Sequence, residues 1–410
     1  MRPEERARRP AGSVRDMPNL PEKATHRQPR AFNQQLVLRA IYDRAQVSRA
    51  ELARLIGLTR TSVSALVAEL LRDGLVEELG PGVSTGGKAP IMLRVRPDGR
   101  HAIGLDLGES VFSGALVDLR GGVVKSAQVA LEGRKGNDAV EVVYGLIDSL
   151  IRRNGQSSLL GVGIGAPGLV DSRSGVVRWS VNLDWSDMPL GSMVSKHFGM
   201  PTVVANDSQA AAVAESTYGS IPWPQNLIVV RVGRGIGAGI ILGGKLYSGD
   251  GSGAGEIGHS IFGDLSPMDR IERCRCGRVG CLETVASMSA MVSAAHRLTP
   301  SITDDESLIA AFKAGDEQAH SVVIRAAGML GEGIAALIAA LNVNHVLLIG
   351  QATHLGNEWL DAVRRQTATS ALPMLARETI IELGETRDDD VVVGASALLM
   401  TQELGLTLVR

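Results

Sequence analysis

All the cysteines of this 410-residue chain lie in one short segment, "RCRCGRVGCLETV". Cys274, Cys276 and Cys281 form a C-x-C-x4-C pattern, so one compact turn supplies three thiol groups. Zn2+ in structural sites is held by four Cys or His ligands arranged as a tetrahedron. The cluster therefore predicts three ligands of a structural zinc site, and a fourth ligand from elsewhere in the chain.

His259, in the segment "GAGEIGHS", is the nearest upstream candidate for the fourth ligand. The 14 residues between His259 and Cys274 include Gly263 and Pro267, which favour a loop that doubles back. A redox switch and a set of ordinary buried thiols are the alternatives. An odd number of clustered cysteines in a reducing compartment favours metal binding. Four protein ligands leave no open position for water, so the predicted role of the metal is structural.

The composition is that of a globular protein, and the length suggests two or three domains. Hydrophobic residues make up 44% of the chain and aromatic residues only 3%, so the core must consist mainly of Val, Leu, Ile and Ala. The formal net charge of -2 excludes a global basic field, so a nucleic-acid site must be local. No apolar run reaches the roughly 18 residues that span a bilayer, and "MRPEERARRP" is unlike a secretory signal. We therefore expect a cytoplasmic protein with no membrane segment.

Residues 1–30 predict a disordered basic tail. They contain eight Lys or Arg, four Asp or Glu and five prolines, and they have no hydrophobic periodicity. Such a tail can contact DNA phosphates, and the alternative is a solvated leader without a role.

Residues 31–96 predict a winged helix-turn-helix domain. The segment "AFNQQLVLRAIYDRA" has apolar residues at helical spacing. A second helix, "RAELARLI", follows Ser48, and Glu51 three residues later completes a capping box. Gly57 breaks that helix, and Thr59 can cap a third, "RTSVSALVAELLRD". The runs "LVEEL" and "IMLRV", joined by the Gly-rich "GPGVSTGGKAP", predict a β-hairpin wing.

The start of the third helix carries small polar side chains and an arginine, which suits the major groove of DNA. The candidate DNA-binding residues on this helix, the preceding helix and the wing are Arg49, Thr59, Arg60, Thr61, Ser62, Ser64 and Lys88. The alternative is a domain that binds another protein. A single helix-turn-helix binds DNA weakly, so we expect a homodimer or homotetramer on a palindromic operator.

Residues 97–410 alternate strand-like and helical segments, which is an α/β pattern. The runs "AIGLDLG", "GVGIGAPG", "TVVAND", "LIVVRVGRGIGAGIIL" and "HVLLIG" are apolar and end in Gly or Asp. Two strand pairs, at 103–118 and 227–247, begin similar halves. The pattern predicts two lobes with a cleft between them.

Several of these segments together resemble the ROK family of repressors and sugar kinases. The motifs "GVGIGAPGLVD", "NLDW", "VVANDSQAAAVAE", "VGRGIGAGIILGGKLYSG" and "GAGEIGHS…CRCGRVGCLE" occur in the family's order over about residues 100–400. The resemblance implies an actin-like fold with two α/β lobes around a sugar cleft. With a winged helix in front, the chain is similar to the sugar-responsive repressor branch, which includes xylose and N-acetylglucosamine repressors. It would control carbohydrate uptake or catabolism genes and be released by sugar.

The resemblance also implies the residues of the sugar site. Asn206, Asp207, Glu256, His259 and Glu283 match the family's sugar ligands, and Asp207 matches the catalytic base of the kinases. Amides and carboxylates suit vicinal hydroxyls because they donate and accept paired hydrogen bonds. In this interpretation the zinc loop, residues 256–283, delivers Glu283, while His259 joins the metal to the sugar. Ser180 and Asn182 are weaker candidates.

The segments that bind ATP in the kinases of this family are altered here. Glu109 and Ser110 replace the Gly-Thr pair of the first phosphate turn, and Arg234 replaces a Thr in the second. Gln351 and Ala352 stand where glycines are usual. Because phosphoryl transfer depends on positioning and charge stabilisation, we expect no enzyme activity. The alternative is a sugar kinase with an added DNA-binding domain.

Overall fold

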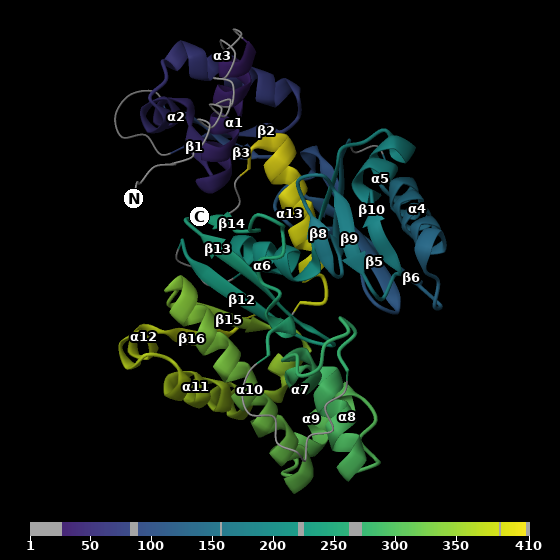
Figure 1. The fold of residues 1–410 in the computed structure, drawn as a ribbon. Helices are drawn as coiled ribbons and strands as arrows, with labels where there is room; N and C mark the ends of the chain where they lie inside the picture. Colours follow the sequence, from purple (N-terminus) through teal and green to yellow (C-terminus); the bar gives the residue numbers. More distant parts are fainter. Residues whose placement is uncertain are drawn as a thin grey trace, which may run out of the picture.

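The computed structural model describes residues 27–82, 89–155, 158–219, 225–261, 273–384 and 387–406. A winged-helix domain sits on the first of two α/β lobes, and the second lobe lies beyond two central helices (Figure 1). Most of the predicted tail, and Lys88 in the wing turn, lie outside the described residues. The first helix begins at Arg27, so residues 27–30 belong to that helix and not to the predicted tail.

The winged-helix domain has the elements that the sequence predicts. They are α1 (Arg27–Asp43), β1 (Val47–Ser48), α2 (Arg49–Ile56), α3 (Arg60–Arg72), β2 (Val76–Pro81) and β3 (Ile91–Val95). The Ser48 side chain accepts from the Glu51 N–H, and the Glu51 carboxylate accepts from the Ser48 N–H, which confirms the capping box. Thr59 caps α3, and Gly57 ends α2 with φ of 69°. Val63, Leu66, Val67 and Leu70 of α3 are buried, so the polar residues of that helix face outward.

The first lobe is built on a five-stranded sheet with the order β11-β7-β4-β5-β6. Its strands are β4 (His101–Leu107), β5 (Val111–Asp118), β6 (Val123–Ala130), β7 (Leu159–Ala166) and β11 (Thr202–Asn206). Two helices cover one face, namely α4 (Gly136–Arg153) and α5 (Leu190–Phe198). A small sheet adds β8 (Leu169–Asp171), β9 (Val176–Ser180) and β10 (Trp185–Met188).

The second lobe is built on another five-stranded sheet, with the order β14-β13-β12-β15-β16. Its strands are β12 (Leu227–Val232), β13 (Ile236–Leu242), β14 (Lys245–Leu246), β15 (His345–Ile349) and β16 (Ile380–Leu383). Its helices are α7 (Glu283–Ala286), α8 (Met288–Leu298), α9 (Asp305–Lys313), α10 (Glu317–Leu341), α11 (Asn357–Ser370) and α12 (Pro373–Glu378). Single-turn helices are η1 (Pro97–Gly99), η2 (Ile257–His259) and η3 (Gln351–Leu355).

Two helices lie between the sheets, α6 (Asp207–Tyr218) and α13 (Asp390–Leu404). Helix α13 runs from the middle of the molecule to the winged-helix domain (Figure 1). Leu399, Met400 and Leu406 share a buried cluster with Leu52 and Leu93 of that domain. One helix therefore connects the region between the two sheets with the winged-helix domain.

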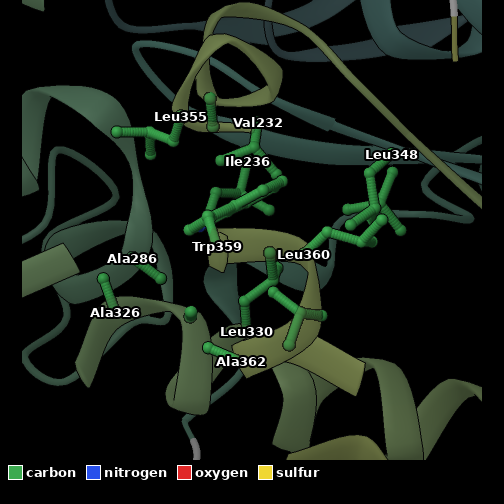
Figure 2. Close-up of a cluster of buried hydrophobic side chains, with 14 of the residues drawn as sticks. Val232, Ile236, Ala286, Ala326, Leu330, Leu348, Leu355, Trp359, Leu360 and Ala362 are labelled. Atoms are coloured by element: carbon green, nitrogen blue, oxygen red, sulfur yellow. The ribbon is translucent and has the colours of Figure 1, made fainter. Parts of the chain in front are cut away.

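A buried cluster in the second lobe fixes the segments that line the cleft. Val232 and Ile236 flank a tight turn between β12 and β13, and both pack into this cluster with Ala286 of α7 (Figure 2). Trp359 of α11 lies within the same cluster and is only 1% exposed. The turn and α7 are thereby held on a packed core.

Helix α10 is, among the described residues, long and apolar enough to cross a membrane by length and composition. Half of its most apolar stretch is buried inside the second lobe. Leu330, Ile334 and Ile338 of this helix belong to the core cluster, so α10 acts here as a core helix.

Gly394 sets the closest approach of the two central helices. A Cβ at this position would lie 1.8 Å from the carbonyl oxygen of Ala210 in α6. We expect Gly394→Ala to force the helices apart and to lower the free energy of unfolding by about 1–3 kcal/mol. Gly145→Ala on α4 is the matched control, because a Cβ there meets nothing within 4 Å. That control should stabilise the protein slightly, and equal urea midpoints for the two variants would contradict the packing argument.

Candidate functional site

A cleft between the lobes brings together residues from distant parts of the chain. The first lobe contributes the ends of β4, β9 and β11, and the second contributes the β12–β13 turn, η2, the cysteine segment and α7. Ends of neighbouring strands meet at one edge of a sheet, which is where α/β folds place their ligand sites. Polar residues lining it include Asp106, Glu109, Ser180, Asn182, Asn206, Asp207, Arg231, Arg234, Glu256, His259, Arg275, Glu283 and Gln351.

The four predicted metal ligands come together at one end of this cleft. The donor atoms of His259, Cys274, Cys276 and Cys281 all lie within 4.8 Å of one another. The Sγ atoms of Cys276 and Cys281 are 3.5 Å apart, and Cys274 Sγ is 3.5 Å from His259 Nδ1. Zn–S bonds of about 2.3 Å in a tetrahedron put sulfur atoms about 3.8 Å apart. The donor set and its spacing therefore fit a tetrahedral Zn2+ ion.

His259 connects this cluster with the carboxylates of the cleft. Its Nδ1 faces Cys274, while its Nε2 lies 3.7 Å from Glu256 Oε2. A carboxylate at the second ring nitrogen orients a metal-binding histidine. Glu283 approaches from the other side, where its Oε1 lies 3.9 Å from Cys274 Sγ and its Oε2 accepts from the Ile236 N–H at 3.2 Å. The structure thus brings three of the predicted sugar residues to the metal cluster.

Asn206 holds the start of α6 in place. Its Oδ1 accepts from the N–H groups of Ser208 and Gln209, and its Nδ2 donates to the Gly168 carbonyl at 3.0 Å. The Asn206 side chain therefore acts mainly as the N-terminal cap of α6. Only the second hydrogen on its Nδ2 remains to bind a ligand.

Asp207, the residue in the kinase-base position, carries an ion pair that the sequence did not predict. Its Oδ2 accepts from Arg231 Nη1 at 3.0 Å, and its Oδ1 accepts from the Ser208 N–H at 2.7 Å. Arg231 lies near the end of β12. The sequence did contain one signal for this ion pair. Arg231 is the single charged residue in the otherwise apolar run "LIVVRV", and a charge in a buried strand needs a partner.

Buried carboxyl groups surround this ion pair. Burial raises the pKa of Asp106 to about 6, while nearby Arg231 opposes and Asp207 reinforces the change. Burial also raises the pKa of Asp390, at the start of α13, to about 7. At the other end of the cleft, burial raises the pKa of Glu256 to about 7, against the opposing effect of His259. Three acidic side chains, Asp106, Asp207 and Asp390, thus lie near the single guanidinium of Arg231.

Glu109 and Arg234, which both depart from the kinase pattern, contact each other across the cleft, and Arg275 joins them. Arg234 Nε lies 2.9 Å from Glu109 Oε2, and Arg275 Nη1 lies 2.7 Å from Glu109 Oε1. Arg275 also donates to Asn182 Oδ1 at 2.6 Å. Asn182, a weaker sugar candidate, is thereby engaged by an arginine. Gln351 lies over the second phosphate turn. A Cβ atom added to Gly233 in that turn would come within 2.3 Å of Gln351 Oε1.

Ser180 differs from its neighbours in the cleft because its hydroxyl is unsatisfied. The residue is 2% exposed, and its Oγ has no hydrogen-bond partner among the residues that the structure describes. Buried hydroxyls are nearly always paired, so this one suits a ligand or a bound water.

The predicted DNA-contacting residues lie on the exposed start of α3. Thr59, Arg60, Thr61, Ser62 and Ser64 are all exposed. Thr59 also serves as the cap, and its Oγ1 lies 2.9 Å from Ser62 Oγ. On α2, Arg49 donates to Glu78 in β2 at 2.7 Å, which ties the helix pair to the wing.

Known sequences and structures match both parts of the chain. The sequence profile of the ROK family matches residues 102–402, which is more than half of the chain. The chain belongs to the ROK family. The profile of the MarR family matches residues 31–82, within the winged-helix domain. The ROK family and the N-terminal winged helix are as the sequence predicts, and the match adds that the winged-helix domain is of MarR type.

Relatives of this ROK-family protein include repressors and kinases. The xylose repressor of Caldicellulosiruptor bescii is 30% identical over 389 residues, which cover 91% of this chain and 96% of the relative. A crystal structure of a ROK family transcriptional regulator, a homolog of the E. coli MLC protein, matches this chain with a TM-score of 0.80 at 24% sequence identity. The match covers 93% of this chain and 98% of that regulator's chain. A ROK family glucokinase from Streptomyces griseus, in complex with glucose and AMPPNP, has a TM-score of 0.64 at 26% identity and covers 73% of this chain and 98% of its own.

Proposed function

We propose that this ROK-family protein is a sugar-responsive transcriptional repressor of carbohydrate uptake or catabolism genes. One observation carries the proposal. The same chain contains an exposed, polar helix suited to DNA and a cleft in which Asp207, at the position of the kinases' catalytic base, is paired with Arg231. The named repressor among its relatives supports this function over that of a kinase. A protein that binds chromosomal DNA would act in the cytoplasm.

The effector in this proposal is a neutral sugar bound in the cleft. The second lobe offers hydrogen-bond acceptors from the Glu256 and Glu283 carboxylates and a donor from His259. Asp207 and the remaining amide hydrogen of Asn206 lie on the opposite side of the cleft. Vicinal hydroxyls both donate and accept, so a sugar can pair with such a set. A ligand without those hydroxyls would leave the polar groups unpaired and bind poorly.

Three features oppose phosphoryl transfer in this cleft. Arg231 Nη1 binds Asp207 Oδ2, so one oxygen of the carboxylate that would act on a sugar hydroxyl in a kinase is already occupied by a guanidinium. Glu109 places a carboxylate in the first phosphate turn, where it already binds Arg234 and Arg275 in place of a phosphate group, and Gln351 covers the second phosphate turn. A ROK protein with these substitutions is expected to bind sugar without phosphorylating it.

The metal in this proposal is a structural Zn2+ ion held by His259, Cys274, Cys276 and Cys281. Such an ion would tie η2, which carries His259 next to Glu256, to the segment that leads into α7 and Glu283. It would supply a rigid cross-link and would hold the two carboxylates at a fixed separation. The chain's own residues would make the sugar contacts.

Repression in this account depends on the relative orientation of the lobes. A homodimer would place two winged helices on a palindrome, since a single helix-turn-helix binds weakly. Helix α13 connects the region between the two sheets with the winged-helix domain, so a change between the lobes would reach the DNA-binding surface. Sugar can release DNA only if it binds one orientation more tightly than the other.

Ser180 provides a direct test of the sugar site. We expect one member of a panel of xylose, glucose and N-acetylglucosamine to raise the melting temperature, and Ser180→Ala to weaken its binding about 5-fold to 30-fold. The reason is that a hydrogen bond to a buried hydroxyl contributes about 1–2 kcal/mol. Calorimetric titration measures the affinity.

Ser192→Ala is the control for this test, because Ser192 is an exposed serine on α5 in the same lobe. It should leave the affinity unchanged. If none of these sugars stabilises the wild-type protein, or if the two alanine variants bind alike, the cleft does not recognise sugar in the way proposed.

A further inference from the structure

Three charged residues join the two lobes at the mouth of the cleft. Glu109 follows β4 in the first lobe, Arg234 lies in the β12–β13 turn of the second lobe, and Arg275 lies within the cysteine segment. The two carboxylate oxygens of Glu109 contact different arginines, at 2.9 Å to Arg234 and 2.7 Å to Arg275. Each oxygen therefore bonds one guanidinium, and the carboxylate spans both.

Further contacts extend this connection on the first-lobe side. Arg275 donates to Asn182, between β9 and β10, and Arg234 Nη1 lies 3.4 Å from Ser110 Oγ. Arg275 stands between two predicted metal ligands, so the metal segment is itself tied to the first lobe. The arginines reach across the cleft from two separate segments of the second lobe.

The charges are arranged so that the chain supplies its own anion. Two arginines that reach from the second lobe to the same point of the first lobe would ordinarily need an added anion between them, because like charges repel. The Glu109 carboxylate fills that place, and its side chain is 27% exposed, less than either arginine. The lobes can therefore meet at this point without a bound nucleotide or phosphate.

We infer that Glu109, Arg234 and Arg275 form an interlobe latch that holds the cleft closed in the absence of nucleotide. This inference goes beyond the proposed function, because it concerns how the lobes are held together and not what they bind. The latch replaces an external ligand by a pair of internal ion pairs. In the sequence, Glu109 and Arg234 look like two separate losses of kinase phosphate-turn residues. In the structure these two residues form an ion pair with each other.

The latch is poised to open because its ion pairs are partly exposed. The side chains of Arg234 and Arg275 are 58% and 52% exposed, so water and salt screen them. A pair of such contacts changes an equilibrium modestly, by about 3-fold to 30-fold. That range suits a cleft that must also open.

Hydrogen exchange on the ligand-free protein tests the latch without relying on sugar or DNA. In about 0.01 M salt, Glu109→Gln should speed exchange of the backbone amides at 107–111 and 233–236 by about 3-fold to 30-fold, while in about 1 M salt the variant and wild type should exchange alike. The charge-swapped double variant E109R/R234E should exchange more slowly than E109R alone, because the pair between positions 109 and 234 is restored with reversed charges. Glu132→Gln is the matched control, because Glu132 is an exposed residue that pairs with Arg134 in its own loop.

A Glu109→Gln protein that exchanges at the wild-type rate in low salt would overturn the latch. So would faster exchange that is the same at both salt concentrations, because it would indicate lost packing and not a lost ion pair. An E109R/R234E protein that exchanges as fast as E109R alone, or faster, would also contradict it. These outcomes are independent of whether the sugar panel succeeds.

Discussion

Replacement of Cys281 by alanine is expected to abolish the response to sugar while leaving DNA binding intact. Cys281 is fully buried and is one of the four predicted metal ligands, two positions before Glu283 in the chain. Loss of one thiolate leaves a metal site incomplete, and structural Zn2+ sites contribute a large share of local folding energy. Without the cross-link, the two carboxylates of the second lobe lose their fixed separation.

The winged-helix domain should be spared by this change because it shares its buried cluster with the first lobe. The measurement is DNA affinity and sugar-induced DNA release for wild type, Cys281→Ala and chelator-treated wild type, with metal content determined for each. Wild type reloaded with zinc after chelation is the control and should regain its full response. Full sugar-induced release from protein that contains no metal would show that the metal and sugar sites are not coupled.

Replacement of Arg60 by alanine is expected to weaken operator binding about 10-fold to 100-fold. Arg60 begins α3 and is exposed there, in the part of a recognition helix that enters the major groove. A bidentate arginine contact to a base contributes about 1–3 kcal/mol of discrimination. Fluorescence anisotropy with an operator fragment, repeated at several salt concentrations, measures the effect and separates base contacts from phosphate contacts.

Arg72→Ala provides the matched control for Arg60, because Arg72 is an exposed arginine at the opposite end of the same helix. It should change affinity little. Equal losses for the two variants would indicate that α3 binds through its general charge, and an unchanged Arg60→Ala protein would place the DNA contact elsewhere.

Features encoded by neighbouring residues could be predicted from the sequence. The capping box of Ser48 and Glu51, the Thr59 cap and the C-x-C-x4-C turn each depend on spacings of a few positions. His259 could be added because a structural zinc site needs a fourth Cys or His ligand and this histidine is the nearest one upstream. The start of α1 was placed four positions too late, since "RQPR" carries no apolar periodicity.

Contacts between distant segments could not be predicted. The pairing of Asp207 with Arg231 joins the start of α6, which lies between the sheets, to a strand of the second lobe, and Glu109 meets arginines more than 100 positions away. The sequence shows each charge but not its partner, which depends on how the lobes close. For the same reason Asn182 looked available for sugar, although Arg275 engages it in the fold.

The most direct test of the proposed function is selection of sheared genomic DNA by the purified, zinc-loaded protein, with sequencing in the presence and absence of a pool of sugars. We predict enrichment of a palindrome next to carbohydrate genes, and loss of that enrichment when one sugar is present. Absence of any enriched sequence in either condition would contradict a DNA-binding repressor, and enrichment that no sugar changes would contradict its control through the cleft.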